Sequence, residues 1–252
     1  MNIKKHIPNT ITCGNLLCGC LAIVQTFTGN LAWTAYLVGI ALVLDFFDGF
    51  TARKLKVASP IGKDLDSLAD MVTFGVVPGI VMFQLLNISL KSEFIVEPRW
   101  HTTVFPLGYL ANLGFIITIF SAIRLAKFNN DTRQTDSFIG VPTPANAMLV
   151  CSLPLICQFQ PELNFITGFI ANPWFLAVLT CLMSFLLVSE IPLFALKFKN
   201  FSWATNKLAY CFLIVSILLI LALHFMAIPL IILLYILVSI VNNIFLKSGI
   251  KK

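Results

Sequence analysis

The stretch that decides the fold reads Asp45-Phe46-Phe47-Asp48-Gly49-Phe50-Thr51-Ala52-Arg53, and Gly62, Asp66 and Asp70 follow it after eight intervening residues. Its four aspartates lie inside or at the rim of two segments that are otherwise apolar enough to span a bilayer. One carboxylate at the bilayer centre costs about 2.5–3.5 kcal/mol on insertion scales, so four unpaired ones would cost on the order of 10 kcal/mol. The segment therefore predicts a ligand or partner that compensates these charges.

The helical spacing of these residues predicts what that ligand is. At about 100° per residue, one helical face carries Asp45, Asp48, Gly49 and Ala52, and a second face carries Gly62, Asp66 and Asp70. Two opposed acidic faces form an all-oxygen site for hard divalent cations such as Mg²⁺. The ligands that this pattern predicts for two cations are Asp45, Asp48, Asp66 and Asp70.

The other residues of the stretch favour a phosphorylated ligand beside the cations. Gly49 and Ala52 remove side-chain bulk, and Gly62 does the same on the facing helix, so a ligand can lie against the backbone. The guanidinium group of Arg53 offers a bidentate fork for phosphate oxygens. The whole string fixes eight positions across 26 residues, which makes it far more specific than an isolated pair of aspartates.

Composition places the chain among all-α polytopic membrane proteins. Of its 252 residues, 58% are hydrophobic and 11% are charged, and the mean hydropathy is +0.92. About eight apolar windows approach the roughly 20 residues that a membrane-spanning helix needs, at 10–28, 31–52, 62–87, 104–126, 142–159, 171–193, 205–224 and 226–246. We expect a single membrane domain over residues 1–252, with a catalytic core at about 8–147 and C-terminal helices at about 165–246.

The basic residues predict the orientation. With eight spans and both termini in the cytoplasm, 15 of the 17 Lys and Arg residues fall in cytoplasmic segments, and Lys91 and Arg99 are the exceptions. This asymmetry follows the positive-inside rule and places the aspartates near the cytoplasmic surface. The cations are spread over five segments, so the net charge of +6 indicates attraction to the cytoplasmic leaflet and not nucleic-acid binding.

Three other interpretations compete at this stage. The aspartates could form inter-helix salt bridges, which would leave the glycines and the alanine without a role. They could relay cations or protons in an ion transporter, although the last three spans lack polar breaks. They could bind a diphosphate in a membrane prenyltransferase, although no second D-x2-D motif follows Asp70.

The string D-x2-D-G-x2-A-R-x8-G-x3-D-x3-D resembles the signature of the CDP-alcohol phosphotransferase family, and every signature position is filled. Further blocks at 8–16, 66–75, 124–129 and 138–145 resemble the phosphatidylserine synthases within that family. This resemblance implies attack of L-serine on the β-phosphorus of CDP-diacylglycerol, release of CMP, and two Mg²⁺ or Mn²⁺ ions. It also implies a homodimer in a bacterial plasma (inner) membrane, with the active site facing the cytoplasm.

The resemblance assigns roles residue by residue. Asp70 would accept the proton of the alcohol as well as bind metal. The nucleotide and its diphosphate would be bound by Gly49, Ala52, Arg53 and Gly62, and by Asn9 and Thr12 on the first span. The polar stripe to which Asn9, Thr12 and Asn15 belong has a second interpretation, in which it joins helices together.

The acceptor site is the least determined part. Its candidate residues are Asn15, Arg124, Lys127, Asn129, Pro142 and Pro144. Arg124 and Lys127 serve equally well as positive-inside anchors, and the two prolines either shape a pocket or simply start a helix. The same chemistry with glycerol 3-phosphate, inositol phosphate or another alcohol therefore stays open.

Overall fold

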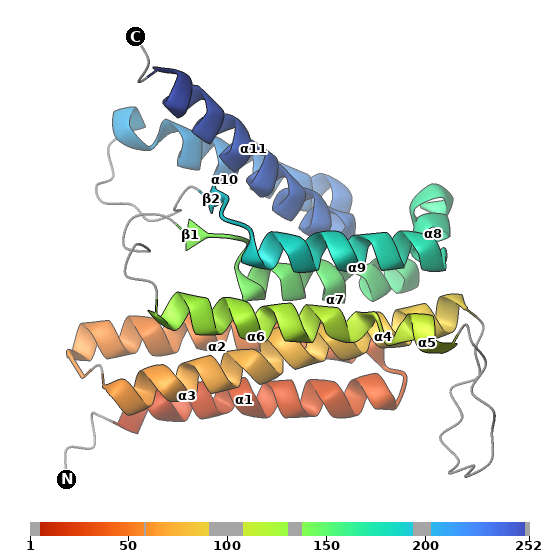
Figure 1. Ribbon diagram of the computed structural model, residues 1–252, viewed down its shortest axis with the longest axis horizontal. Helices are drawn as coiled ribbons and strands as arrows, with labels where there is room; N and C mark the ends of the chain where they lie inside the picture. Colours follow the sequence, from red (N-terminus) through yellow and green to blue (C-terminus); the bar gives the residue numbers. More distant parts are fainter. Residues whose placement is uncertain (1–5, 58, 91–107, 131–137, 194–202, 250–252) are drawn as a thin grey trace.

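The structure is a computed structural model that describes residues 6–57, 59–90, 108–130, 138–193 and 203–249, and most of them are helical (Figure 1). In chain order, the helices that precede the first strand are α1 (His6–Phe27), α2 (Leu31–Leu55), α3 (Pro60–Asp70), the π-helical turn η2 (Met71–Val76), α4 (Val77–Ser89), α5 (Gly108–Ala111) and α6 (Gly114–Asn130). The elements that follow are β1 (Phe138–Ile139), α7 (Thr143–Phe159), α8 (Asn164–Ile170), α9 (Pro173–Val188), β2 (Pro192–Leu193), α10 (Trp203–Leu223), the 3₁₀ turn η3 (His224–Met226) and α11 (Ala227–Gly249).

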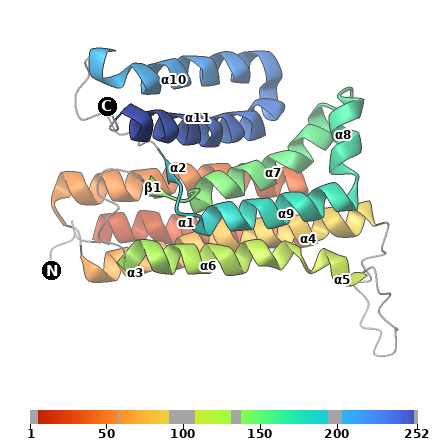
Figure 2. The same ribbon diagram turned by 45° about the horizontal axis from the view of Figure 1, so that its top comes forward.

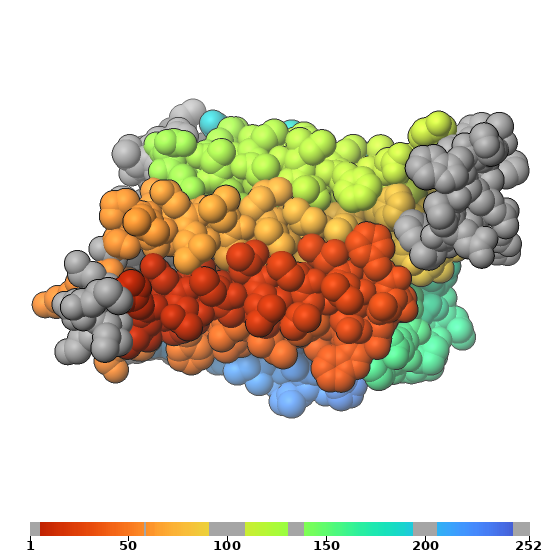
Figure 3. Space-filling view, turned by 90° about the horizontal axis from the view of Figure 1, so that it is seen from below, coloured from red at the N-terminus to blue at the C-terminus, as the bar shows by residue number. Residues whose placement is uncertain are grey.

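The long helices form a bundle in which successive helices run in opposite directions (Figures 1 and 2). Helices α1, α2, α3–α4 and α6 make up the lower part of Figure 1, α7 and α9 lie above them, and α10 and α11 form the upper edge. The space-filling view from below shows α1, α3–α4 and α6 side by side along one face (Figure 3). Because the directions alternate, α1 begins and α11 ends at the same end of the bundle.

The turn between α2 and α3 lies at that end and is fixed by local sequence. Lys56 ends α2 in the left-handed conformation, with φ 54°. Ser59 then caps α3 by accepting a hydrogen bond from the Gly62 amide at 3.1 Å, and Pro60 occupies the first turn, where no amide donor is needed. This short connection reverses the chain, so that α2 and α3 run antiparallel and both pack on α1, with their acidic segments facing each other.

A π-helical turn interrupts the helix that begins at α3. Residues Met71–Val76 continue directly from Asp70 into α4, which gives a 30-residue helix from Pro60 to Ser89. Two hydroxyl groups hold the turn: Thr73 donates to the Asn15 carbonyl on α1 at 3.2 Å, and Thr118 on α6 donates to the Gly75 carbonyl at 3.1 Å. Such π turns are frequent at functional sites because they change the register of the side chains around them.

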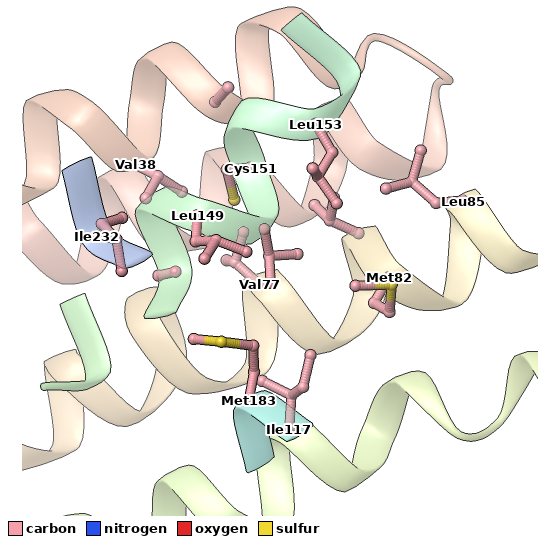
Figure 4. Packing of buried hydrophobic residues seen from close by; sticks show 14 of the residues in the cluster. Val38, Val77, Met82, Leu85, Ile117, Leu149, Cys151, Leu153, Met183 and Ile232 are labelled. Atoms are coloured by element: carbon pink, nitrogen blue, oxygen red, sulfur yellow. The ribbon is translucent and has the colours of Figure 1, made fainter. Parts of the chain in front are cut away.

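The core lies where α2, α4, α6, α7, α9 and α11 converge. Val38, Met82, Ile117, Leu149 and Met183 come from five of these helices and point toward one another (Figure 4). All five are 1% exposed or less. This core holds the helices in place behind the acidic segments.

The entry into α7 is tied to the end of α9. Strands β1 and β2 pair antiparallel, with Ile139 opposite Pro192. Gly140 follows with φ +74°, and a Cβ there would lie 2.5 Å from the Leu187 carbonyl oxygen, so a larger residue is excluded on both counts. The Val141 amide then donates to the Leu186 carbonyl at 3.0 Å. These contacts fix the start of α7 relative to the bundle.

The membrane-span predictions are confirmed at a coarser level. By length and composition, the described residues contain five helices able to cross a membrane, or six if α8 and α9, which are bent by 73°, count as one span. Helix α7 has 17 residues, and α9 ends at Val188, short of the predicted 193. The 38-residue stretch from Asn206 to Asn243 folds back at η3, where His224 has φ 49° (Figure 2). Eight spans and their orientation stay predictions, and residues 104–107 of one window lie outside the described residues.

Candidate active site

Three of the four predicted aspartates form one cluster. Asp45 and Asp48, three residues apart near the end of α2, face Asp66 in the middle of α3. Each offers a carboxylate oxygen, and these oxygens lie within 4.8 Å of one another. Asp48 is buried, whereas Asp45 and Asp66 are half-buried. The opposed acidic faces that the spacing predicts therefore meet.

Asp70 lies one helical turn beyond Asp66 and closes the cluster on its inner side. Its carboxyl group is within hydrogen-bonding reach of Asp45. It also accepts a hydrogen bond from Nδ2 of Asn15 on α1 at 3.2 Å. It is the last residue of α3, directly before the π-helical turn. Asp70 therefore joins the metal-ligand cluster to the interior of the bundle.

Helix α1 orients the cluster from the other side. The Thr12 hydroxyl group donates a hydrogen bond of 2.6 Å to Oδ2 of Asp48, and both residues are buried. A donor at this distance from a carboxylate is a strong, charge-assisted contact. It fixes one carboxylate oxygen of Asp48 and leaves the other oxygen for a ligand.

A cavity of about 220 Å³ opens beside the aspartates, between α1, α2 and α3. All six residues that the sequence predicts for the nucleotide and its diphosphate line it: Asn9, Thr12, Gly49, Ala52, Arg53 and Gly62. Asp48, Asp66, Ser59 and Lys63 also line it. The cavity therefore combines carboxylates on its inner wall with Arg53 and Lys63, both exposed, at its mouth.

The glycines of this cavity are needed for space. A Cβ at Gly62 would lie 3.2 Å from Oδ1 of Asn9, and a Cβ at Gly49 would lie 3.2 Å from Nη1 of Arg53. Both distances are tighter than ordinary carbon contacts, so a side chain at either position would displace a group that lines the cavity. The sequence argument that these positions must be small is thus supported by the packing.

The cluster fits a hard divalent cation. Its donors are carboxylate oxygens, which Mg²⁺ and Mn²⁺ prefer. Oxygens bound to one ion at about 2.1 Å lie up to about 4.2 Å apart, so the spacing within 4.8 Å requires only a small inward movement. Charge points the same way, because Arg53 beside Asp48 and Arg124 beside Asp70 offset only part of the charge of four carboxylates.

Two of the predicted acceptor residues, Asn15 and Arg124, interact with Asp70. The Asn15 side-chain amide donates a hydrogen bond to it. Arg124 on α6 is 7% exposed, interacts electrostatically with Asp70, and donates from Nη1 to the Thr143 hydroxyl oxygen at 3.5 Å. Its guanidinium group also lies over the ring of Phe128, 5.7 Å from the centroid. Arg124 is thus a buried cation at the inner side of the site and not an exposed anchor.

The other four acceptor candidates lie elsewhere. Asn129 is hydrogen-bonded to two residues of α3. Its side-chain amide donates to Oγ of Ser67 at 2.8 Å, and its backbone carbonyl accepts from Nζ of Lys63 at 3.0 Å. Lys127 is exposed near the end of α6. Pro142 and Pro144 line an apolar groove of about 370 Å³ whose other residues are Leu42, Ala145, Met148, Ile228, Ile231 and Ile232. The structure does not bring these four residues to the aspartates.

Sequence reasoning missed one residue, Asn146. It lies in the first turn of α7, it is 0% exposed, and neither atom of its side-chain amide has a hydrogen-bond partner among the described residues. The available signal was its spacing of three residues from Thr143, which places two polar side chains on one face of an apolar helix.

Comparison with known proteins decides the family. The sequence profile described as CDP-alcohol phosphatidyltransferase matches residues 5–181. The chain belongs to the CDP-alcohol phosphatidyltransferase family. Together with the long apolar helices, membership identifies an integral membrane enzyme. The family match ends within α9, so α10 and α11 lie beyond it.

Relatives within the family share a name. The chain is 34% identical over 197 residues to a CDP-diacylglycerol–serine O-phosphatidyltransferase of Bacillus subtilis. This alignment covers 78% of this chain and 92% of that protein. Proteins of the same name match from Helicobacter pylori strain J99 (35% identity, 57% of this chain and 54% of that protein) and from Methanocaldococcus jannaschii (28% identity, 73% and 72%). The alignment thus spans nearly all of the Bacillus relative but about half of the Helicobacter one.

Proposed function

We propose that this protein transfers the phosphatidyl group of CDP-diacylglycerol to L-serine and releases CMP. The relatives of the same family carry this activity in their name. The observation that carries the proposal is that the six predicted nucleotide-binding residues line one cavity, which opens directly beside the aspartates. The ion-transporter, prenyltransferase and salt-bridge hypotheses explain neither this cavity nor the family match.

The cavity suits a nucleoside diphosphate attached to a lipid. Arg53 and Lys63 at its mouth supply positive charge for phosphate oxygens, and Gly49 and Gly62 let these oxygens approach the backbone. The polar side chains of Asn9 and Thr12 form the α1 wall. The cavity lies at the end of the bundle where α2 turns into α3, so the lipid portion of the substrate has access to the bilayer.

We further propose that Asp45, Asp48, Asp66 and Asp70 bind two divalent cations, Mg²⁺ or Mn²⁺. Bound there, such ions supply Lewis-acid stabilisation of the diphosphate and of the leaving CMP. The chain contributes the geometry: the α2–α3 turn sets the spacing of the carboxylates, and Thr12 fixes the orientation of Asp48.

Asp70 is the proposed base. The serine oxygen forms a bond to the β-phosphorus, the bond from that phosphorus to the CMP oxygen breaks, and the serine proton passes to an Asp70 carboxylate oxygen. The Asn15 amide donates to Oδ1 of Asp70, which holds the carboxylate and leaves Oδ2 for the proton. A positioned base is needed because a free hydroxyl group is a weak nucleophile at neutral pH.

The proposed setting is a bacterial plasma membrane, with both termini and the cavity mouth on the cytoplasmic side. The basic residues around the α2–α3 turn support this orientation. The soluble acceptor and CMP would then exchange with the cytoplasm, and CDP-diacylglycerol would arrive within the inner leaflet. A homodimer is proposed from family resemblance.

The deciding experiment is an acceptor comparison with purified protein. CDP-diacylglycerol and Mn²⁺ are supplied with L-serine, glycerol 3-phosphate or inositol phosphate, and both CMP and the lipid product are measured. We expect CMP and phosphatidylserine with L-serine. CMP release only with another acceptor would replace the substrate and keep the chemistry, whereas no release with any acceptor would overturn the proposal.

The same assay tests the cations. EDTA should abolish CMP release, and added Mg²⁺ or Mn²⁺ should restore it, because four carboxylates at one site repel the diphosphate unless cations lie between them. Ca²⁺ prefers longer bonds and more ligands, so it serves as the matched control and should restore less activity. Full activity in EDTA would contradict the two-cation proposal.

A further inference from the structure

Three helices carry buried polar atoms without a hydrogen-bond partner among the described residues. Oδ1 of Asn15 on α1, Nε of Arg124 on α6, and both amide atoms of Asn146 on α7 find no hydrogen-bond partner among the described residues. Asn15 and Asn146 are 0% exposed, and Arg124 is 7% exposed. Buried polar groups in folded proteins are nearly always paired with protein, water or ligand. Several of them together indicate a position that a polar ligand completes.

Two of these three residues, Asn15 and Arg124, interact with Asp70. The other amide atom of Asn15 donates to Oδ1 of Asp70 at 3.2 Å, and Arg124 interacts electrostatically with the same carboxylate. Arg124 is anchored by Thr143, to which it donates at 3.5 Å. Asp70 is therefore flanked by α1 on one side and by α6 and the start of α7 on the other.

The geometry of α7 places Asn146 on the same side as this cluster. At about 100° per residue, Asn146 lies about 60° around the helix from Thr143, the residue that contacts Arg124. Pro144, Ala145 and Met148, which line the apolar groove, occupy the nearly opposite face. Asn146 thus belongs to the interior face that α7 presents to Arg124.

We propose that Asn146 and Arg124 form the binding pocket for the acceptor amino acid, with Arg124 pairing with its carboxylate and the Asn146 side-chain oxygen accepting a hydrogen bond from its ammonium group. This inference rests on the proposed function. A guanidinium group binds a carboxylate through two N–H groups along one edge of the guanidinium plane. The unpartnered Nε of Arg124 can supply one of these two donors. An ammonium group has three donors and no acceptor, so it requires oxygens such as those of Asn146 and Asn15.

The charge of the cluster favours a free amino acid over a phosphorylated alcohol. A phosphate carries close to two negative charges and is bound by several cations, whereas among the described residues Arg124 is the cation that interacts electrostatically with Asp70. A zwitterion carries one charge of each sign and matches one guanidinium group together with neutral oxygens. A serine held in this way points its hydroxyl group toward Asp70, the proposed base.

The test is a comparison of two acceptors in two enzymes. L-serine and 3-hydroxypropionate share the hydroxyl and carboxylate groups, and only L-serine has the ammonium group. The wild type should prefer L-serine in kcat/KM by about tenfold to a hundredfold, the usual effect of one hydrogen bond to a charged group. Asn146→Ala should raise the KM for L-serine by a similar factor, leave 3-hydroxypropionate nearly unaffected, and keep the KM for CDP-diacylglycerol.

Two further variants keep the test decisive. Asn146→Leu keeps the branched shape and the number of side-chain heavy atoms, and it should reproduce the loss of preference if the alanine variant is unstable. Ser152→Ala is the matched control, because Ser152 is a buried polar residue of the same helix that already donates to the Leu149 carbonyl at 2.7 Å. It should leave the preference unchanged.

The outcomes separate this proposal from the proposed function. Asn146 variants that keep the preference, or that lose activity equally with both acceptors, overturn the pocket assignment while serine transfer by the wild type still stands. A wild type that releases no CMP with L-serine overturns the proposed function itself. Thermal stabilisation of the purified protein by L-serine gives a readout independent of turnover, and Asn146→Ala should reduce it.

Discussion

Asp70 has the most distinctive surroundings of the four aspartates. Its carboxyl group is within hydrogen-bonding reach of Asp45, accepts a hydrogen bond from Asn15 and interacts electrostatically with Arg124. We predict that Asp70→Asn lowers kcat for CMP release by at least about 10²-fold, the usual contribution of a positioned base. The amide has the same shape and retains an oxygen that can accept from Asn15, so the melting temperature should change little.

The matched control for this substitution is Asp64→Asn. Asp64 lies on α3 within the same stretch but is exposed and lines a surface depression on the side of the helix that faces α6. It should leave kcat unchanged. An Asp70→Asn protein that keeps full activity would remove Asp70 as base and as metal ligand together.

Thr12 acts through Asp48, to which it donates at 2.6 Å. We predict that Thr12→Val, which preserves the shape, raises the Mg²⁺ or Mn²⁺ concentration for half-maximal activity by about tenfold to a hundredfold, because groups that orient metal ligands typically contribute this much to metal affinity. Thr10→Val is the control, since Thr10 is exposed and donates only to the His6 carbonyl of its own helix. The same half-maximal metal concentration in the Thr12→Val and Thr10→Val proteins would contradict the role of Thr12 in orienting Asp48.

At single residues, the spacing of the motif predicted which aspartates lie together, whereas the positions of the acceptor candidates depend on helix packing. The aspartates and the small residues have a fixed helical spacing, so their common face follows from the sequence. Asn129 and Lys127 lie on α6 with Arg124, but they occupy other positions around the helix. Asn129 therefore donates a hydrogen bond to Ser67 of α3 and does not reach the aspartates. The position of Asn146 could not be predicted from the sequence, because it depends on which face of α7 packs against α6. That face is set by segments that are distant in the sequence.

Among the helices, α4 and α6 approach each other closely. Helix α4 follows Asp70 after the π-helical turn η2, and α6 carries Arg124. At their crossing, a Cβ on Gly114 would lie 2.5 Å from the Phe83 amide nitrogen and 2.8 Å from the Gly79 carbonyl oxygen. Small residues allow such close approach of backbones in membrane bundles.

We predict that Gly114→Ala separates these helices, destabilises the protein by about 1–3 kcal/mol, as overpacked sites do, and raises the KM for the acceptor. The measurement is the melting temperature in detergent together with KM. Gly39→Ala is the control within α2, because a Cβ there meets nothing within 4 Å. Alanine normally stabilises a helix interior by about 0.5–1 kcal/mol relative to glycine, so the control should melt no lower than the wild type. A Gly114→Ala protein as stable as the control would contradict this packing.

The apolar windows predicted where helices occur, but they did not predict the turns and bends within these helices. The window at 62–87 corresponds to the continuous α3–α4 helix, and nothing in its hydropathy marks the π-helical turn at Met71–Val76. That turn depends on hydroxyl groups of two other helices. The bend between α8 and α9 likewise arises at Asn172 and Pro173, where Asn172 caps a new helix by accepting from the Trp174 amide at 2.9 Å.

In the whole molecule, the C-terminal hairpin of α10 and α11 is hydrogen-bonded to the rest of the bundle at both of its ends, to α7 at one end and to β2 at the other. Gln160, at the end of α7, donates to the Leu223 carbonyl at 3.0 Å and accepts from the Met226 amide at 2.9 Å. At the opposite end, the Asn243 side chain donates to the Pro192 carbonyl. The division into a catalytic core and C-terminal helices stays a proposal, but these contacts show the hairpin packed as part of one bundle.

The alternating helices also determine where the ends of the bundle must lie relative to the membrane. Thr28, between α1 and α2, and Glu162, between α7 and α8, lie at one end, and Lys56, between α2 and α3, lies at the other (Figure 1). Arg53, Lys54 and Lys56 make the second end basic. By the positive-inside rule, we expect that end to face the cytoplasm.

We therefore predict that single cysteines at the two ends react from opposite sides. In a variant whose seven native cysteines are replaced by alanine, Thr28→Cys and Glu162→Cys should react with a membrane-impermeant maleimide in intact cells. Lys56→Cys should react only after the membrane is opened, since maleimides require a hydrated thiolate. Retained CMP release verifies each variant. Labelling of Lys56→Cys in intact cells would place the active site outside, where neither the lipid-linked nucleotide nor its product would meet the cytoplasmic pool.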